Sequence, residues 1–126
     1  MKALVVDDSR AIRSIVRRTL ETQGFLVFEA GHGQEALECL DADPEIGLLL
    51  VDWNMPVMNG LDLVRILRRD ALHPDRARLP ILMVTTETEV QQMVRALAAG
   101  ANEYLMKPFS PNALVAKLNL LGVEAA

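Results

Sequence analysis

Residues 48–56 read LLLVDWNMP, an apolar run that ends on an acidic residue and continues into a proline-containing turn. The run from Leu48 to Val51 contains no polar residue, which is typical of a strand covered on both faces. Four other short apolar runs lie at residues 3–6, 26–28, 81–84 and 104–105, and helical patterns separate them. This alternation predicts an α/β fold, a doubly wound, five-stranded parallel sheet with right-handed crossovers.

Apolar stripes at helical spacing predict five helices, and we expect these stripes to pack in the core. Their members are Ile12, Ile15, Val16 and Leu20; Ala36, Leu37 and Leu40; Leu61, Val64 and Leu67; Val90, Met93, Val94 and Leu97; and Leu114, Leu118 and Leu121. Gly24 and Gly100 predict helix ends, Ser110-Pro111 predicts the start of the last helix, and Thr88-x-x-Gln91 predicts a capping box. Residues 70–79 predict a long surface loop.

Composition excludes several classes of function. A length of 126 residues predicts one domain, residues 1–126, with a core that needs no disulfide or structural metal. The net charge of −4 argues against broad binding to nucleic acid or to anionic membranes. The one cysteine, Cys39, excludes an internal disulfide. The sequence shows no long apolar span and no signal peptide, so we expect a soluble, cytoplasmic protein.

Reactive side chains follow four of the five predicted strands. Asp7 and Asp8 follow the first strand, Asp52 the third, Thr85 the fourth and Lys107 the fifth. Ligands of open parallel sheets bind outside the carboxyl ends of the strands, so these groups are expected to share one pocket. Three carboxylates repel one another unless a hard cation such as Mg²⁺ lies between them. Metal, ammonium and hydroxyl around an oxygen nucleophile are the groups that phosphoryl transfer uses.

Each of these residues has an ordinary interpretation when it is considered alone. Asp7-Asp8 could be a charge pair at a helix N-terminus, and Asp52 could be a turn former. Lys107 could be a surface lysine, and Tyr104 a half-buried strand residue. Their joint position at the strand ends favours a functional site.

Together these motifs resemble the receiver domain of two-component response regulators, of the single-domain chemotaxis (CheY-like) type. The resemblance rests on Asp7-Asp8, on residues 52–60, on Thr85 and on residues 104–109, and it covers essentially the whole chain. It implies a flavodoxin-like sheet with strand order 2-1-3-4-5.

The resemblance also implies the chemistry of the site. Asp52 would accept a phosphoryl group from a sensor histidine kinase or a histidine phosphotransfer protein. Asp8, Asp52 and the backbone carbonyl of Asn54 would bind Mg²⁺ or Mn²⁺, and Asp7 would act through a metal-bound water. Lys107 would pair with the phosphoryl group.

The output of the domain would depend on two switch residues. Thr85 would move toward the phosphoryl group and Tyr104 would turn inward. The surface formed by the fourth predicted helix, the fifth strand and the last helix would then change its affinity for a downstream protein. The family also implies a cis bond between Lys107 and Pro108.

Three residues are expected to set the rate of phosphoryl hydrolysis. Asn54 and Glu87, two positions beyond Asp52 and Thr85, resemble the pair found in fast-cycling members. Thr86 departs from the family, which usually has alanine or glycine there, and its bulk would restrict access to the phosphoryl group.

Three other functions are compatible with parts of the pattern. A dehalogenase-like phosphohydrolase would need a D-x-D motif after the first strand, where this chain has Asp7-Asp8-Ser9. A nucleotide or flavin binder would need a glycine- or hydroxyl-rich phosphate loop there. An interaction domain that has the receiver fold but works without phosphorylation would not need the carboxylates, hydroxyl and lysine at the strand ends.

Overall fold

The five apolar runs form one parallel sheet in a computed structural model that describes residues 1–86 and 90–125. The strands are β1 (Lys2–Val6), β2 (Leu26–Ala30), β3 (Ile46–Val51), β4 (Ile81–Thr85) and β5 (Glu103–Met106). Their order is β2-β1-β3-β4-β5, and every neighbouring pair is parallel. The predicted fold class and strand order are therefore confirmed.

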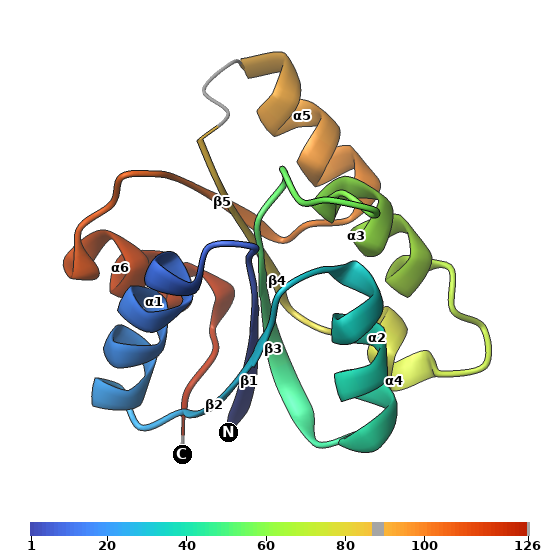
Figure 1. The fold of residues 1–126 in the computed structure, drawn as a ribbon, viewed down its shortest axis with the longest axis horizontal. Coiled ribbons are helices and arrows are strands. Elements are labelled where there is room, and N and C mark those ends of the chain that lie inside the picture. Colours follow the sequence, from blue (N-terminus) through green and yellow to red (C-terminus); the bar gives the residue numbers. More distant parts are fainter. Residues whose placement is uncertain (87–89, 126) are drawn as a thin grey trace.

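Helices cover both faces of the sheet, as the uninterrupted apolar strands require. One face is covered by α1 (Arg10–Thr22) and α6 (Pro111–Leu121), the other by α2 (Gly33–Ala42), α3 (Gly60–Arg68) and α5 (Val90–Ala99), as Figure 1 shows. Residues of β3 alternate between the two cores, with Leu48 and Leu50 facing α1 and α6 and with Leu49 and Val51 facing the other helices.

The prediction of five helices was incomplete. A sixth, one-turn helix, α4 (Pro74–Ala77), lies inside the predicted loop. Pro74 is its first residue, where the missing N–H of proline removes no helical hydrogen bond. The segment remains at the surface, and Leu72 beside it is 87% exposed.

The prediction that the α5 stripe is core packing was wrong. Val90, Val94 and Leu97 are exposed, while Ala96 is fully buried and Met93 packs at the core boundary. Because α5 packs against β5 and α3 through a narrow side, small and flexible residues fill that side, and the larger valine and leucine side chains face outward. Ile15 of α1 is likewise exposed, and Leu121 of α6 is half-buried.

Local signals place most helix ends as predicted. Gly24 and Gly100 have positive φ angles of 96° and 121°, which glycine adopts without steric cost. The Ser110 hydroxyl accepts a hydrogen bond from the N–H of Ala113 at the start of α6. The predicted Thr88 capping box lies outside the described residues. No helix in the described ranges has both the length and the apolar character needed to cross a membrane.

Candidate functional site

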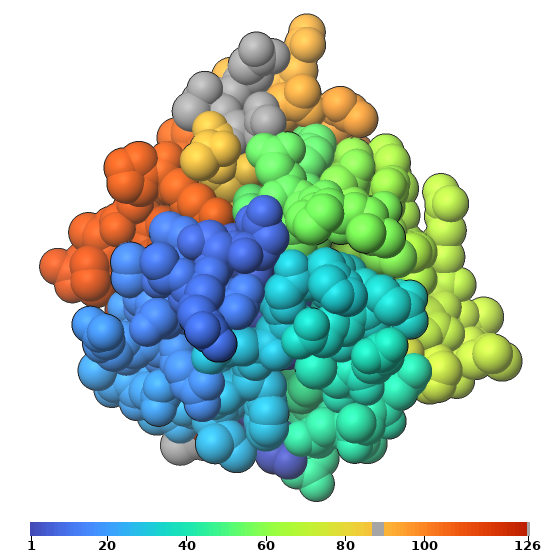
Figure 2. Space-filling view, viewed as in Figure 1, coloured from blue at the N-terminus to red at the C-terminus, as the bar shows by residue number. Residues whose placement is uncertain are grey.

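The carboxyl ends of four strands meet at one edge of the sheet, at the top of Figure 1. Asp7 follows β1, Asp52 follows β3, Thr85 ends β4 and Lys107 follows β5. All these segments reach the face of the molecule shown in Figure 2, where the blue, green, gold and orange parts of the chain adjoin. The topology thus brings the predicted side chains to one place, although they lie up to 100 positions apart in the sequence.

Three carboxylates form a cluster at this edge. Asp7, Asp8 and Asp52 each offer an oxygen within 4.8 Å of the others. Asp7 and Asp52 are buried, whereas Asp8 is exposed. Oxygen ligands at this spacing with one solvent-facing side fit a hard divalent cation that keeps several water molecules. Such an acidic triad is typical of the Mg²⁺ site of receiver domains.

The Lys107 ammonium lies between two of these carboxylates. Its Nζ atom is 2.6 Å from Asp7 Oδ2 and 3.4 Å from Asp52 Oδ2, and its side chain is 11% exposed. Its backbone N–H donates to the carbonyl of Thr85, which fixes the start of the loop after β5. The peptide bond from Lys107 to Pro108 is cis, as the family resemblance implied.

The surroundings of Asp52 disfavour its negative charge. Burial raises its pKa, and the negative charge of Asp7 raises it further. Lys107 and the backbone N–H of Asn54, which donates to the Asp52 carboxylate, act in the opposite direction. A cation in the cluster would therefore stabilise the ionised form of Asp52 that a nucleophile requires.

The position of Asp7 depends on residues that the sequence interpretation missed. The backbone N–H of Ser9 donates to Asp7 Oδ1 at 2.9 Å, and the Arg13 guanidinium donates to the Asp7 carbonyl at 2.6 Å. Arg13 also pairs with Glu29 at the end of β2, and Arg17 pairs with the same carboxylate. The sequence feature that could have revealed these contacts is the spacing of Arg13 and Arg17, which lie one helical turn apart on a helix that must pack beside β2.

A close backbone contact fixes the loop after β3. Gly60 begins α3, its N–H donates to the Trp53 carbonyl, and a Cβ atom at this position would lie 2.1 Å from the Asp52 carbonyl oxygen. Any side chain at this position would therefore clash with the Asp52 backbone, and only glycine fits. Trp53 is buried beside Asp52, and the Arg95 guanidinium of α5 lies 5.7 Å from the centre of its ring.

Of the other predicted residues that the structure describes, Thr85 ends β4, Thr86 and Asn54 lie just beyond β4 and β3, and Tyr104 lies within β5. Thr85 is fully buried and Tyr104 is 3% exposed, so both side chains point into the molecule. Asn54 and Thr86 are exposed. Glu87 lies outside the described residues.

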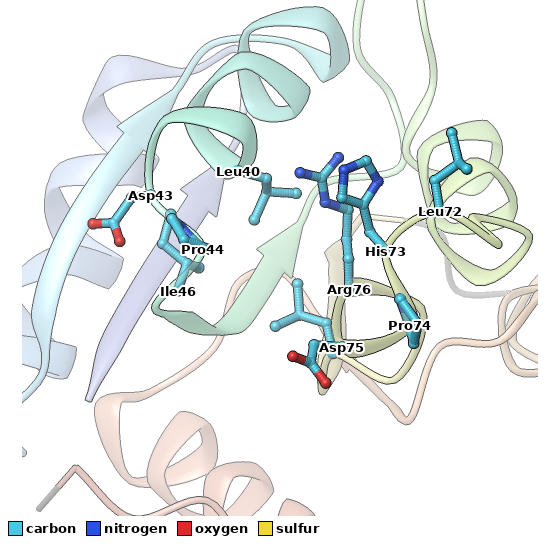
Figure 3. A pocket seen from close by; sticks show the side chains of 10 residues that line it. Leu40, Asp43, Pro44, Ile46, Leu72, His73, Pro74, Asp75 and Arg76 are labelled. Carbon is cyan, nitrogen blue, oxygen red and sulfur yellow. The ribbon is translucent and has the colours of Figure 1, made fainter.

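A separate hollow of about 270 Å³ lies at the opposite end of the sheet, near the starts of β3 and β4 (Figure 3). It has an apolar floor that includes Leu40 and Ile46, and a polar rim that includes His73 and Arg76. Its carboxylates and cations do not converge as those of the acidic cluster do. We therefore place the reactive chemistry at the carboxyl ends of the strands.

Comparison with known proteins agrees with this geometry. Residues 3–119 match the model of the response regulator receiver domain. The chain is 48% identical over 122 residues to chemotaxis protein CheY1 of Helicobacter pylori (strain ATCC 700392 / 26695), and the match covers 96% of each chain. It is 46% identical over 119 residues to a CheY homolog of Campylobacter jejuni, covering 94% of this chain and 89% of that protein. The solved structure of Vibrio cholerae CheY4 superposes with a TM-score of 0.86 at 38% identity, covering 95% and 97% of the two chains. The chain therefore belongs to the response regulator receiver family, as a CheY-like receiver domain of a two-component system.

Proposed function

We propose that Asp52 is the phospho-acceptor of this receiver domain and that residues 1–126 act as one signalling unit. The observation that carries the proposal is the Lys107 ammonium, which lies 3.4 Å from a buried Asp52 carboxylate within the acidic cluster. A receiver domain implies a histidine kinase partner. Its function is signalling and not conventional enzymatic turnover.

The chemistry follows from the groups at the strand ends. An Asp52 oxygen attacks the phosphorus of a phosphohistidine on a sensor kinase or a phosphotransfer protein, so that the N–P bond breaks and an O–P bond forms. Lys107 pairs with the transferred phosphoryl oxygens, and the Thr85 hydroxyl donates to one of them. Water later cleaves the acyl phosphate and regenerates Asp52.

The metal of this site is proposed to be Mg²⁺ or Mn²⁺. Asp8, Asp52 and the backbone carbonyl of Asn54 would be direct ligands, and Asp7 would act through a bound water. The cation would neutralise charge that develops on the phosphoryl oxygens.

The output surface is proposed to be the α5–β5–α6 surface. It presents the exposed apolar side chains Val90, Val94 and Leu97 of α5 and Met106 of β5, which suit a protein target in the cytoplasm better than nucleic acid or membrane. Thr85 and Tyr104 are proposed to link Asp52 to this surface. Asn54, Thr86 and Glu87 are proposed to set the rate of hydrolysis.

We expect Mg²⁺ to change the fluorescence of Trp53, the one tryptophan of the chain, because it is buried directly beside Asp52. Beryllofluoride, a mimic of the phosphoryl group, should change it again. The apparent Mg²⁺ affinity should fall as the pH is lowered through the raised pKa of Asp52, because protonation competes with metal binding. A titration at several pH values measures both effects. A folded protein without any response to millimolar Mg²⁺ would refute the metal site.

We expect Arg13→Gln to weaken Mg²⁺ binding roughly tenfold, because the variant loses the hydrogen bond that fixes the Asp7 backbone. Arg17→Gln is the matched control, since Arg17 also pairs with Glu29 but does not contact Asp7. Each variant should lower the free energy of unfolding by less than about 1 kcal/mol. Equal effects of the two variants on the Trp53 titration would show that Arg13 acts through general stability and not by positioning Asp7.

A further inference from the structure

Four arginines gather where α3 packs against α5, beside the loop that carries Asp52. Arg65 and Arg68 belong to α3, Arg69 ends it, and Arg95 comes from α5. Together with Ala98 and Ala99 they line a hollow of about 310 Å³. Figure 2 shows the two helices at the surface, α3 in green below α5 in orange.

The positive charge of this cluster lacks compensation within the described part of the chain. The Arg65 guanidinium has one acidic neighbour, Asp62, at 3.6 Å. Arg68, Arg69 and Arg95 take part in no ion pair among the described residues. Several basic residues elsewhere pair with carboxylates at 3.1 Å or less, namely Lys2, Arg13, Arg76, Lys107 and Lys117. A local excess of cations in a chain with a net charge of −4 attracts anionic partners to this face.

One of the four arginines has a structural role that explains its position. Arg68 donates to the carbonyls of Ala77 and Gly100 and to the side-chain oxygen of Asn102, so it joins α3 to α4 and to the start of β5. All its acceptors are neutral, and its charge therefore adds to the field of the hollow. The exposed Arg69 takes part in no ion pair among the described residues, whereas the exposed Arg95 donates to the side-chain oxygen of Gln92 and lies 5.7 Å from the centre of the Trp53 ring, so both of its contacts are also with uncharged groups.

An apolar strip adjoins the arginines. Val57, Met58 and Ile66 share a second hollow, of about 590 Å³, with Arg65, Arg69 and the Arg65 neighbour Asp62. Val57 is 98% exposed and has a φ angle of 69°, a left-handed conformation that is unfavourable for a β-branched residue. The turn therefore presents an apolar side chain to solvent in a strained backbone, a combination that is common at binding sites.

We propose that this arginine surface, made of Val57, Met58, Arg65, Ile66, Arg69 and Arg95, binds an acidic amphipathic segment of a partner protein. Guanidinium groups bind carboxylates in a planar, two-point arrangement, and the apolar strip would contact the apolar side of the same segment. A free phosphate would leave the strip unused, and none of the residues that line the two hollows is aromatic, so a nucleotide base finds no stacking surface. This surface shares α5 with the α5–β5–α6 surface through Arg95, but it includes none of Val90, Val94, Leu97 and Met106, and the proposed binding involves no phosphorylation step.

The test uses the full chain and a fluorescein-labelled peptide whose helix carries glutamates on one side and leucines on the other. Fluorescence anisotropy at low and moderate salt measures its affinity. Arg65→Glu/Arg69→Glu should weaken binding about tenfold or more. Arg10→Glu/Arg18→Glu is the control, because these exposed α1 arginines change the net charge equally and should alter binding less than about twofold. If the charge reversal prevents folding, Arg65→Gln/Arg69→Gln replaces it in the same measurement.

The apolar half of the proposal has its own variant. Val57→Asn should weaken the peptide about threefold while the fold is kept or stabilised, because asparagine tolerates a positive φ. If a scrambled peptide binds equally well, or if the α1 control loses as much peptide affinity, net charge alone explains the binding and the proposal is overturned. Displacement by pyrophosphate or by an oligonucleotide at comparable concentration would overturn it in favour of a phosphate ligand, and absence of peptide binding would overturn it outright.

Discussion

Asp52→Asn is expected to abolish labelling of the chain by a radiolabelled small-molecule phosphoryl donor in the presence of Mg²⁺. The amide is not a nucleophile at neutral pH, and the other carboxylate close to Lys107, that of Asp7, is hydrogen-bonded to both Lys107 and Ser9. Label that is counted after gel separation measures the effect. Asp62→Asn, on the exposed face of α3, should keep the wild-type rate.

The same variant should raise the free energy of unfolding. Burial and the charge of Asp7 raise the pKa of Asp52 in the fold above its value in the unfolded chain. The free energy of unfolding therefore falls as the pH rises from the unfolded-state pKa to the folded-state pKa. Asparagine removes this loss, and urea unfolding at neutral pH should show a higher midpoint. Labelling of the variant at the wild-type rate would exclude Asp52 as the acceptor. Lack of labelling in both proteins, over a range of donors and Mg²⁺ concentrations, would favour an interaction domain that works without phosphorylation.

Gly60→Ala is expected to lower the free energy of unfolding by about 3 kcal/mol or more. The added methyl group would lie 2.1 Å from the Asp52 carbonyl oxygen and 2.8 Å from Val51 Cγ1. The first of these atoms belongs to the backbone at the end of β3 and cannot move without shifting the proposed acceptor. We therefore also expect the Mg²⁺ response of Trp53 to decrease in any fraction that folds.

Gly31→Ala is the matched control for this substitution. A Cβ atom at Gly31 would meet its nearest neighbours at 3.7 and 3.9 Å, which is ordinary van der Waals contact. Its stability should be unchanged or raised by about 0.5 kcal/mol. Urea unfolding of the three proteins side by side measures the difference, and similar stabilities would mean that the α3 N-terminus moves freely relative to Asp52.

The sheet was predictable because its strands carry the strongest signal that a single sequence offers. A run such as Leu48 to Val51, apolar on both faces, is compatible with few positions other than the centre of a parallel sheet. The acidic cluster followed from topology, since carboxyl ends of parallel strands share one edge. The family match then decides against the phosphohydrolase and the nucleotide- or flavin-binding alternatives.

The environment of α5 was not predictable from its stripe. Val94 and Leu97 fit helical spacing as well as any core residue does, and hydrophobic periodicity reports an apolar face without saying which neighbour covers it. Here the buried side includes Ala96, a residue too small to dominate a pattern. The one-turn helix α4 was missed because four residues are too few to show a period.

The contacts that complete the site could not be predicted from sequence motifs, for a different reason. Arg13 contacts the Asp7 backbone and Gly60 approaches the Asp52 backbone, so neither contact involves a recognisable pair of side-chain types. Such contacts depend on the angle at which a helix leaves a strand, which local sequence determines weakly. The residues that bear the chemistry were therefore predictable, whereas the residues that position their backbone were found in the structure.

The first and the last described segments of the chain meet at the edge of the sheet opposite the acidic cluster, where the amino group of Met1 donates to the Ala125 carbonyl (Figure 1). A fluorophore, an affinity handle or a solid support attached at either end would therefore lie far from Asp52. Tethering through a terminus leaves the acidic pocket and the arginine surface open at the same time, so surface-based measurements of kinase and partner binding can share one immobilised preparation. A circularly permuted chain that joins these ends and opens in the exposed segment near Leu72 would preserve every strand and every strand end of the site.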